Sequence, residues 1–282
     1  MGSIVHLARK RELTRRSLHL LSRLLYTLAP ITWAKISDAL RSPNQERERL
    51  FLNAIIKPGD VAIDVGAHNG LYTRALERAG AQVLAFEPFP EVGLVIERTT
   101  GRSVEWRQKA ISNRGGEAEI RVPISNNRPV YGYASMAPEN FFGPDFVVHN
   151  VPVSTIDNEI RERCSFIKID VEGHELDVLR GTLGTIDAYA PAFLIESEAR
   201  HAKRAPLSVF EFFAEIGYEG FFILGNNLKS VSEFKIEDHQ NPDAIDLEGS
   251  EKDRNYINNF FFFPSRSKLP GQLAAELARR AK

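Results

Sequence analysis

VAIDVGAHNGLYTRALERAGAQVLAFEP, residues 61–88, is the stretch that decides the fold of this chain. Its first five residues form a short, largely apolar run that is interrupted by Asp64, a pattern typical of a buried parallel strand. Gly66 and Gly70 then bracket a turn. The opening of the stretch therefore predicts a strand that ends in a glycine turn.

The second half of the same stretch completes a repeating unit. The residues from Leu71 to Ala79 suit a helix, and Val83 to Phe86 form a second buried strand that closes on Glu87 and Pro88. A strand, a glycine turn, a helix and a strand ending in an acid form the first half of a nucleotide-binding α/β fold. Glu87 lies about twenty residues beyond the turn, which is the spacing at which an acid meets ribose hydroxyls.

The spacing of the two glycines indicates the kind of cofactor. Gly66-x-x-x-Gly70 is not the GxGxxG pattern, so a pyrophosphate on the helix N-terminus is not specifically indicated. A nucleoside cofactor without a pyrophosphate fits better. S-adenosylmethionine is the obvious candidate.

Composition limits the function classes. The chain has 282 residues, 43% hydrophobic and 26% charged, as expected for a globular protein. A net charge of -1 argues against a general nucleic-acid binder. Cys164 is the single cysteine, so no intrachain disulfide forms and we expect a reducing, cytoplasmic compartment. No apolar run is long enough to span a bilayer, and Arg23 interrupts the apolar segment that a signal peptide would need.

The N-terminal residues predict a helical extension outside the cofactor unit. Leucines recur at helical spacing among basic residues, and Pro30 is expected to end this helix: Leu13, Leu18, Leu21, Leu24, Leu25 and Leu28, with Arg9, Lys10, Arg11, Arg15, Arg16 and Arg23. One interpretation is a helix packed across the domain or against a second subunit of a homo-oligomer. The other is peripheral contact with the anionic inner face of a membrane. A second helix is expected over 44–56.

The middle of the chain is expected to alternate strands and helices. We predict a helix over 89–99, a strand over 104–111 and a half-exposed strand over 117–122. Residues 123–150 are rich in proline, glycine and aromatics and are interpreted as a long functional loop. Its aromatic residues either line a pocket or anchor the loop to the core, and the sequence does not decide between these: Tyr131, Tyr133, Phe141, Phe142 and Phe146.

The second half continues the alternation. Strands are expected over 166–171, 192–195, 219–224 and 259–263, with helices over 174–181, 207–216 and 270–282. This order predicts a mostly parallel sheet with helices on both faces. We divide the chain into a helical extension (1–56), a catalytic domain (57–268) and a C-terminal helical tail (269–282).

Polar residues collect where these strands end, and ligands of open α/β sheets bind beyond the carboxyl ends of the strands. Each acid there has a structural alternative, namely capping the next helix or neutralising an arginine. Several carboxylates on one rim raise one another's pKa and are costly without a role. The collected residues are 64–69, Glu87, Lys109, Asp170, Glu172, Glu196 and Glu198.

A family resemblance covers residues 60–225. The motifs are IDVGAHNGLYT (63–73), AFEP (85–88), STID (154–157), FLIE (193–196), the Gly217-Tyr218 turn and above all FIKIDVEGHELDVLRG (166–181). In this order they resemble the FkbM-type S-adenosylmethionine-dependent methyltransferases. One departure is His68, where the family often has an asparagine, and Asn69 is the expected substitute.

The resemblance implies a fold and a cofactor site. The fold is the class I methyltransferase, Rossmann-like α/β fold, a seven-stranded, mostly parallel sheet whose last strand, here 259–263, runs antiparallel. Glu87 would accept both ribose hydroxyls, and Asp170 would face the donor's amino group or the acceptor. The other residues implied to bind S-adenosylmethionine are Asp64, Gly66, Ala67, His68, Asn69, Gly70 and Tyr72 around the methionine end, and Phe89, Lys109 and Ala110 around the adenine.

Methyl transfer requires that the acceptor atom be aligned with the methyl group and that water be excluded. A sugar hydroxyl has a high pKa, so a general base or a metal would help. The candidates are Asp170, Glu172, His174 and Glu196, although a histidine at a helix start is commonly a cap or a packing residue. A divalent cation held by Asp170 and other carboxylates is left open, and no metal ligand is assigned.

The resulting hypothesis is an O-methyltransferase that acts on a carbohydrate, a glycolipid or a secondary metabolite. The acceptor class comes from the resemblance alone. The alternatives are an N-methyltransferase and a non-catalytic nucleotide-binding scaffold that is recruited through its basic N-terminal helix.

Overall fold

The computed structural model describes residues 24–25, 27–40, 46–125, 127–137, 145–242 and 256–281. The N-terminal half of the expected first helix, including Leu13, Leu18 and Leu21, lies outside these residues. Phe141 and Phe142 of the expected loop also lie outside them, as does the final residue, Lys282.

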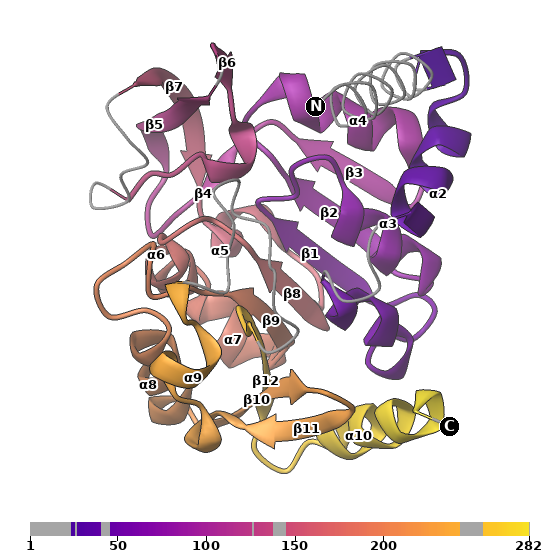
Figure 1. The fold of residues 1–282 in the computed structure, drawn as a ribbon, viewed down its shortest axis with the longest axis vertical. Helices are drawn as coiled ribbons and strands as arrows, with labels where there is room; N and C mark the ends of the chain where they lie inside the picture. Colours follow the sequence, from indigo (N-terminus) through magenta and orange to yellow (C-terminus); the bar gives the residue numbers. More distant parts are fainter. Residues whose placement is uncertain are drawn as a thin grey trace, which may run out of the picture.

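A large sheet organises the described residues (Figure 1). Its eight strands follow the order β11-β10-β12-β9-β8-β1-β2-β3. Five neighbouring strands of this order pair in parallel, namely β9, β8, β1, β2 and β3. β12 runs antiparallel to both of its neighbours, β9 and β10. The bounds are β1 Val61–Val65, β2 Gln82–Phe86, β3 Val104–Arg107, β8 Phe166–Ile169, β9 Ala192–Glu196, β10 Tyr218–Leu224, β11 Asn227–Ser230 and β12 Asn259–Pro264.

This arrangement confirms the predicted fold class, with one difference in strand count. All seven strands expected of the class I methyltransferase sheet are present, and β12 is the predicted antiparallel strand. The expected count of seven is wrong by one because β11 forms a hairpin with β10 around a turn at Gly225 and adds an eighth strand.

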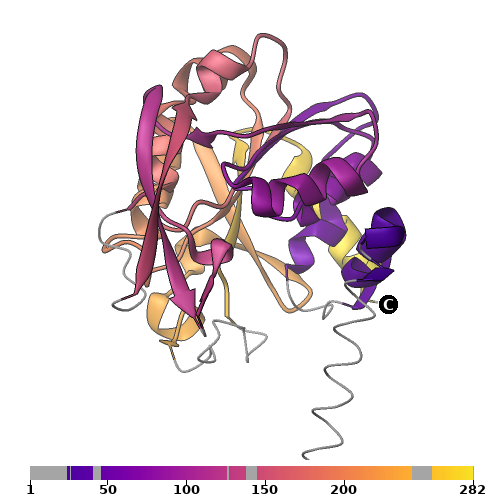
Figure 2. The same cartoon turned by 90° about the horizontal axis from the view of Figure 1, so that it is seen from above.

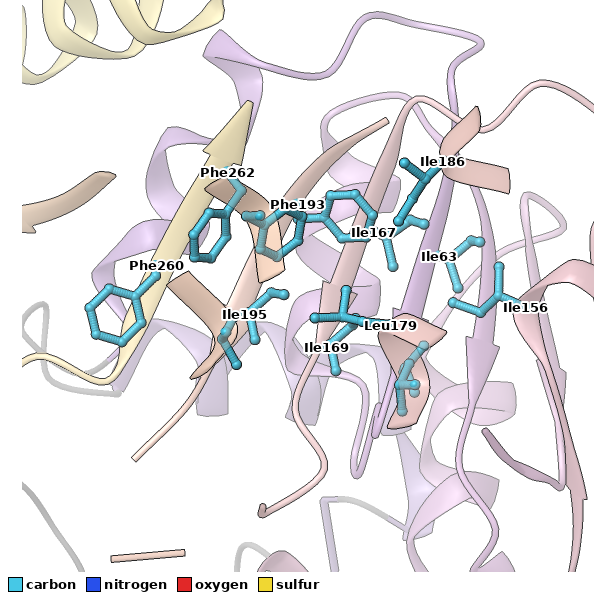
Figure 3. Packing of buried hydrophobic residues seen from close by; sticks show 14 of the residues in the cluster. Ile63, Ile156, Ile167, Ile169, Leu179, Ile186, Phe193, Ile195, Phe260 and Phe262 are labelled. Atoms are coloured by element: carbon cyan, nitrogen blue, oxygen red, sulfur yellow. The ribbon is translucent and has the colours of Figure 1, made fainter. Parts of the chain in front are cut away.

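Helices cover both faces of this sheet, and therefore the inner strands are apolar along nearly their whole length. Figure 3 shows one face, where alternate side chains of four strands pack on two helices: Ile63, Ile167, Ile169, Phe193, Ile195, Phe260 and Phe262, against Leu179 and Ile186. That face is covered by α6 Glu175–Arg180, α7 Leu183–Tyr189 and α8 Leu207–Glu215. The other face is covered by η1 Arg47–Ala54, α3 Leu71–Arg78, α4 Pro90–Thr99 and α10 Leu269–Arg280.

A second, smaller sheet stands beside the first, as the view from above makes plain (Figure 2). Its strand order is β4-β7-β5-β6, with β4 Ala110–Ile111, β5 Gly116–Ser125, β6 Arg128–Pro129 and β7 Phe146–Ser154. Two predictions are corrected here. The strand expected over 104–111 is split between the two sheets, and residues 123–150 are not one loop, since β6, η2 Tyr131–Tyr133 and the start of β7 lie within them.

The helices near the N-terminus also differ from expectation. Helical residues do precede Pro30, but α2 Pro30–Leu40 begins at this proline, which a first helical turn tolerates. The helix expected over 44–56 is the short 3₁₀ helix η1. Short elements that the sequence did not predict are α5 Ile156–Glu159, α7, η3 Val231–Glu233 and α9 Ile236–His239.

A buried ion pair attaches α2 to the domain. Asp38 is 7% exposed, and its carboxylate accepts hydrogen bonds from Arg74 Nη2 at 2.8 Å and from Arg74 Nε at 3.1 Å. Arg78 Nη1 donates a further bond at 3.1 Å. Burial by itself would raise the pKa of Asp38, but the two guanidinium groups hold it below its ordinary value.

The single cysteine lies at the approach to β8. The side chain of Cys164 is fully buried, and its thiol donates to the carbonyl oxygen of Phe166 at 3.4 Å. Burial raises the pKa of this thiol to about 12.

Candidate functional site

A cavity of about 310 Å³ opens where β1, β2, β8 and β9 end, at the edge predicted for ligand binding. Every residue predicted to bind the cofactor or to act in catalysis lines it, except Gly70: Asp64, Gly66, Ala67, His68, Asn69, Tyr72, Glu87, Phe89, Lys109, Ala110, Asp170, Glu172, His174 and Glu196. Glu198, which was collected at the same rim, does not line the cavity and forms an ion pair with Arg200. Gly70 instead precedes α3, where a Cβ atom would lie 2.9 Å from the Ile96 side chain.

The glycine turn forms the floor between two strand ends. The amide groups of Gly66 and Ala67 both donate to the carbonyl oxygen of Phe86 at 3.0 Å, which ties the turn to β2. On its other side, a Cβ atom at Gly66 would lie 1.7 Å from the carbonyl oxygen of Asp170. Gly66 also has φ +76°, so only glycine fits this position.

Glu87 is held rigidly at the end of β2. Its side chain is buried, and the backbone amides of His68 and Phe89 each donate to one of its carboxylate oxygens at 2.9 Å. Burial raises the pKa of Glu87 to about 7 despite these two bonds. The carboxyl group is therefore fixed in orientation, and its charge depends on pH and on what binds beside it.

An aromatic group lies beyond Glu87. Phe89 packs against Tyr131 with ring centroids 5.0 Å apart, and against His149 at 5.3 Å. Tyr131 comes from η2, and both it and Ile120 of β5 line the cavity. The second sheet therefore builds one wall of the cavity. Of the three loop aromatics that the structure describes, Tyr131 lines this cavity, while Tyr133 and Phe146 do not.

Lys109 lies between the two sheets at this end of the cavity. Its ammonium group forms an ion pair with Glu159 at 2.8 Å, and Arg107 reaches the same carboxylate at 2.5 Å. Burial would raise the pKa of Glu159, but these two cations and Ser154 lower it to about 2. Lys109 thus lines the cavity with its charge already compensated.

The opposite end of the cavity is acidic around one buried lysine. Asp64 accepts a hydrogen bond from Thr73 Oγ1 at 2.6 Å, and burial raises its pKa to about 6. Lys168 is fully buried, and its Nζ lies 3.7 Å from Asp170 Oδ2. Burial also raises the pKa of Glu196 well above its ordinary value, and Asn258 Nδ2 donates to this carboxyl group at 2.9 Å.

The side chains of Asp170 and Glu172 do not point the same way, because the segment that joins them is not extended. Glu172 has φ +52°, and its carboxylate forms an ion pair with His201 Nδ1. Gly173 follows with φ +95°, and its amide donates to Glu175 Oε1 at 2.7 Å. The turn therefore directs the carboxylate of Glu172 toward His201 and leaves Asp170, at 30% side-chain exposure, beside Lys168.

His174 is not a side-chain cap of α6. Its Nε2 lies 2.8 Å from Ser112 Oγ, and its Nδ1 lies 3.5 Å from Asp177 Oδ2. Burial lowers the pKa of His174, which favours the neutral imidazole at pH 7. A neutral imidazole therefore lines the cavity one strand away from the glycine turn.

Two charged cavity residues were missed from the sequence. Lys168 was quoted within FIKIDV but given no role, although a lysine inside an apolar strand is a strong signal, because lysine is rarely fully buried. Glu46, which directly precedes η1, also lines the cavity, and no pattern in its sequence neighbourhood pointed there. Within the described residues, no group of three or more His, Cys, Asp or Glu side chains is arranged to hold a metal ion.

Comparison with known proteins gives one family. A family model described as the methyltransferase FkbM domain matches residues 64–219, which is more than half of the chain. No curated protein matches the chain.

Several solved structures are similar in outline. Methyltransferase FkbM from Methylobacillus flagellatus KT is 16% identical with a TM-score of 0.48, and the match covers 74% of this chain but only 44% of that one. SMU.1697c from Streptococcus mutans, solved in complex with SAH, is 10% identical with a TM-score of 0.43, covering 79% and 99% of the two chains.

Proposed function

The chain belongs to the FkbM family of S-adenosylmethionine-dependent methyltransferases, and we propose that it methylates a hydroxyl group of a carbohydrate, a glycolipid or a secondary metabolite. The donor supplies a methyl group on a sulfonium centre. The protein supplies alignment of the two reactants, exclusion of water and acceptance of the hydroxyl proton.

The position of Glu87 is the single observation that most strongly supports a binding site for the methyl donor. Its carboxyl group is fixed by two backbone amides at the rim that the glycine turn and Asp170 share. We propose that it accepts the ribose hydroxyls, with Phe89 and Tyr131 against the adenine and the glycine turn beside the methionine end. The acidic lining supports this assignment, because the donor carries a net positive charge whereas a pyrophosphate is anionic.

We assign His174 the role of general base. Its imidazole is neutral at pH 7 because it is buried, and a proton acceptor must be unprotonated to act. The other candidates are less suited: Glu172 is paired with His201, and Asp170 lies 3.7 Å from the Lys168 ammonium group. Burial raises the pKa of Glu196 well above its ordinary value, which favours its protonated form. A neutral base suits an alcohol acceptor, and an amine acceptor remains the alternative that activity assays would identify.

Calorimetric titration of the full chain tests the donor site. S-adenosylmethionine is expected to bind, and NAD is not. Replacing Glu87 with Ala should weaken donor binding by about 1–3 kcal/mol, the usual cost of a lost hydrogen bond to a charged group. Since the donor favours ionised Glu87, wild-type affinity should rise as the pH increases toward the Glu87 pKa of about 7 and level off above it, a dependence that the variant should lose.

Other outcomes of the same experiment would change the assignment. Binding of NAD alone would contradict the methyltransferase proposal. Unchanged donor affinity in Glu87→Ala would refute the ribose role. Donor binding without transfer to any glycan or lipid fraction, with and without added metal, would favour the non-catalytic scaffold.

We also propose that the N-terminal helical region contacts anionic membrane, which would bring the site near a glycolipid acceptor. Its described part exposes four large apolar side chains: Leu24, Leu28, Ile31 and Ile36 are 44–74% exposed. The sequence before them is basic, with six Lys and Arg residues against one acid within residues 1–23. Exposed apolar side chains next to a basic segment favour a negatively charged lipid surface. No described helix is long and apolar enough to cross a bilayer.

A further inference from the structure

Lys168 occupies an unusual position for a lysine. It lies in the middle of the central strand β8, paired in register with Asp64 of β1, and its side chain has no exposed surface. Its ammonium group lies over the ring of Tyr72 at 4.9 Å from the centroid. Both residues line the cavity, at the end where Asp170 and Glu196 also lie.

The hydrogen-bonding capacity of this ammonium group is largely unused. An ammonium group has three N–H donors. Among the residues that the structure describes, Lys168 donates one hydrogen bond, to the carbonyl oxygen of Ile169 at 3.2 Å. The Asp170 oxygen, at 3.7 Å, is beyond hydrogen-bond distance. A buried cation is stable only when it is paired and hydrogen-bonded, so the arrangement is suited to an additional anionic partner.

The acids near Lys168 do not fully neutralise or hydrogen-bond its ammonium group. Asp64 is committed to Thr73, and its pKa of about 6 reflects the cost of ionising it in a buried site. Glu196 has its pKa raised further by burial and by Asp170. Lys168 itself stays charged, because the carboxyl groups of Asp170, Glu196 and Asp64 raise its pKa against the effect of burial.

Tyr72 provides the second observation. Its side chain is 5% exposed, and its hydroxyl group is buried without a hydrogen-bond partner within the described part of the chain. A buried hydroxyl without a partner is costly, and such groups usually have a functional reason. Here the unpartnered donor belongs to the residue that lies directly over the Lys168 ammonium group and lines the same cavity.

We propose that Lys168 Nζ and Tyr72 Oη bind the α-carboxylate at the amino-acid end of the methyl donor. This rests on the proposed donor site, in which the glycine turn holds that end. The carboxylate accepts hydrogen bonds from both groups, and the acids beside Lys168 face the donor's ammonium group and sulfonium centre. Lys168 thereby makes the site selective for a donor with an intact amino-acid end over an adenosine thioether without it.

The test compares two uncharged-sulfur ligands by calorimetry. S-adenosylhomocysteine has the amino-acid end, and 5′-methylthioadenosine has the same adenosine and sulfur without it. The full-length wild type should bind the first more tightly. Lys168→Met should lose about 10- to 100-fold in affinity for S-adenosylhomocysteine, the usual range for a hydrogen bond to a charged group, while 5′-methylthioadenosine binding stays within about twofold.

Two further variants sharpen the comparison. Tyr72→Phe should lose a few-fold in affinity for S-adenosylhomocysteine only, and should raise the melting temperature of the ligand-free protein, because it removes a buried hydroxyl without a partner. Lys109→Met is the matched control, since this lysine lines the other end of the cavity and is already paired with Glu159. It should leave the ratio of the two affinities unchanged.

The outcomes separate this inference from the proposed function. If wild type binds neither ligand, the donor site itself is wrong. If wild type binds both and Lys168→Met weakens both equally, or neither, the carboxylate role is refuted. Should Lys168→Met fail to fold, Tyr72→Phe decides: a changed affinity ratio supports the subsite, and an unchanged ratio overturns it.

Discussion

At the scale of single residues, the site depends on positions where a neighbouring backbone atom leaves no room for a side chain. Gly66 is such a position, because its missing side chain leaves room for the carbonyl oxygen of Asp170. The glycine turn and the end of β8 are consequently in direct contact. Residues about a hundred positions apart in sequence must therefore be placed together for the cavity to exist.

Replacing Gly66 with Ala should abolish measurable donor binding. The new Cβ atom would lie 1.7 Å from the Asp170 oxygen, so the turn must move. Gly59→Ala is the matched control: it has a similar φ of +88°, but nothing lies within 4 Å of the added Cβ. The control should lose about 1–2 kcal/mol of stability from the left-handed backbone while keeping its donor affinity. Equal donor affinity in the two variants would contradict the role of this contact.

His174 carries the proposed chemistry at the same scale. His174→Ala should lower kcat by about 10²–10⁴-fold, the usual contribution of a general base, with the Kd for the donor unchanged. Ser112→Ala, which removes the hydroxyl group 2.8 Å from the ring but keeps the imidazole, should have a much smaller effect. If His174→Ala retains full kcat, the histidine only packs against Ser112.

At the scale of elements, the sequence predicted regular, buried strands well and irregular ones poorly. β1, β2, β8 and β9 are short apolar runs with covered faces, so their composition revealed them. β7 was missed because three consecutive apolar residues, 146–148, are exposed and do not alternate. The division between β3 and β4 was missed because both halves have strand composition and only long-range pairing separates them.

In the site too, the sequence predicted the residues that follow buried strands, and it did not predict features that depend on long-range contacts. Motif residues that follow the buried strands lie at the cavity as expected. The orientation of Glu172 was not predictable, because it depends on a positive φ and on His201, which comes from a different part of the chain. The wall contributed by η2 was not predictable either, since it requires the second sheet to fold over the first.

At the scale of elements, mutation can measure how strongly the Asp38–Arg74 ion pair attaches α2 to the domain. Asp38→Ala should lower the free energy of unfolding by about 3–5 kcal/mol, because it leaves the Arg74 guanidinium group, which is 5% exposed, buried without its partner. Glu211→Ala, which removes an exposed pair with Arg204, should leave the melting temperature unchanged. A small effect of Asp38→Ala in urea unfolding would mean that α2 is attached mainly by other contacts.

At the scale of the whole molecule, charge and apolar surface are unevenly distributed. The net charge is only -1, yet the N-terminal segment is basic and the helical residues after it present apolar side chains to solvent. The remainder of the chain is consequently acidic. Such a distribution orients a molecule at a negatively charged surface, because one part is attracted and the rest repelled.

Vesicle co-sedimentation tests whether the protein binds a negatively charged lipid surface. The full chain should sediment with vesicles that contain phosphatidylserine, and less at high salt, but not with neutral phosphatidylcholine vesicles. Leu28→Glu with Ile31→Glu should abolish binding without changing donor affinity. Leu183→Glu with Leu207→Glu, at comparably exposed positions on α7 and α8, should not. If the wild type never sediments, the N-terminal region serves the fold or an oligomer instead.

The burial of Cys164 gives this protein an internal reporter of unfolding. A thiol with a pKa of about 12 and no exposed surface does not react with alkylating reagents while β8 stays in the sheet. Because it is the only cysteine, each modification event records one opening of the region that leads into the strand carrying Lys168. Modification rates measured with and without donor would thus report how strongly an occupied cavity holds the centre of the sheet closed.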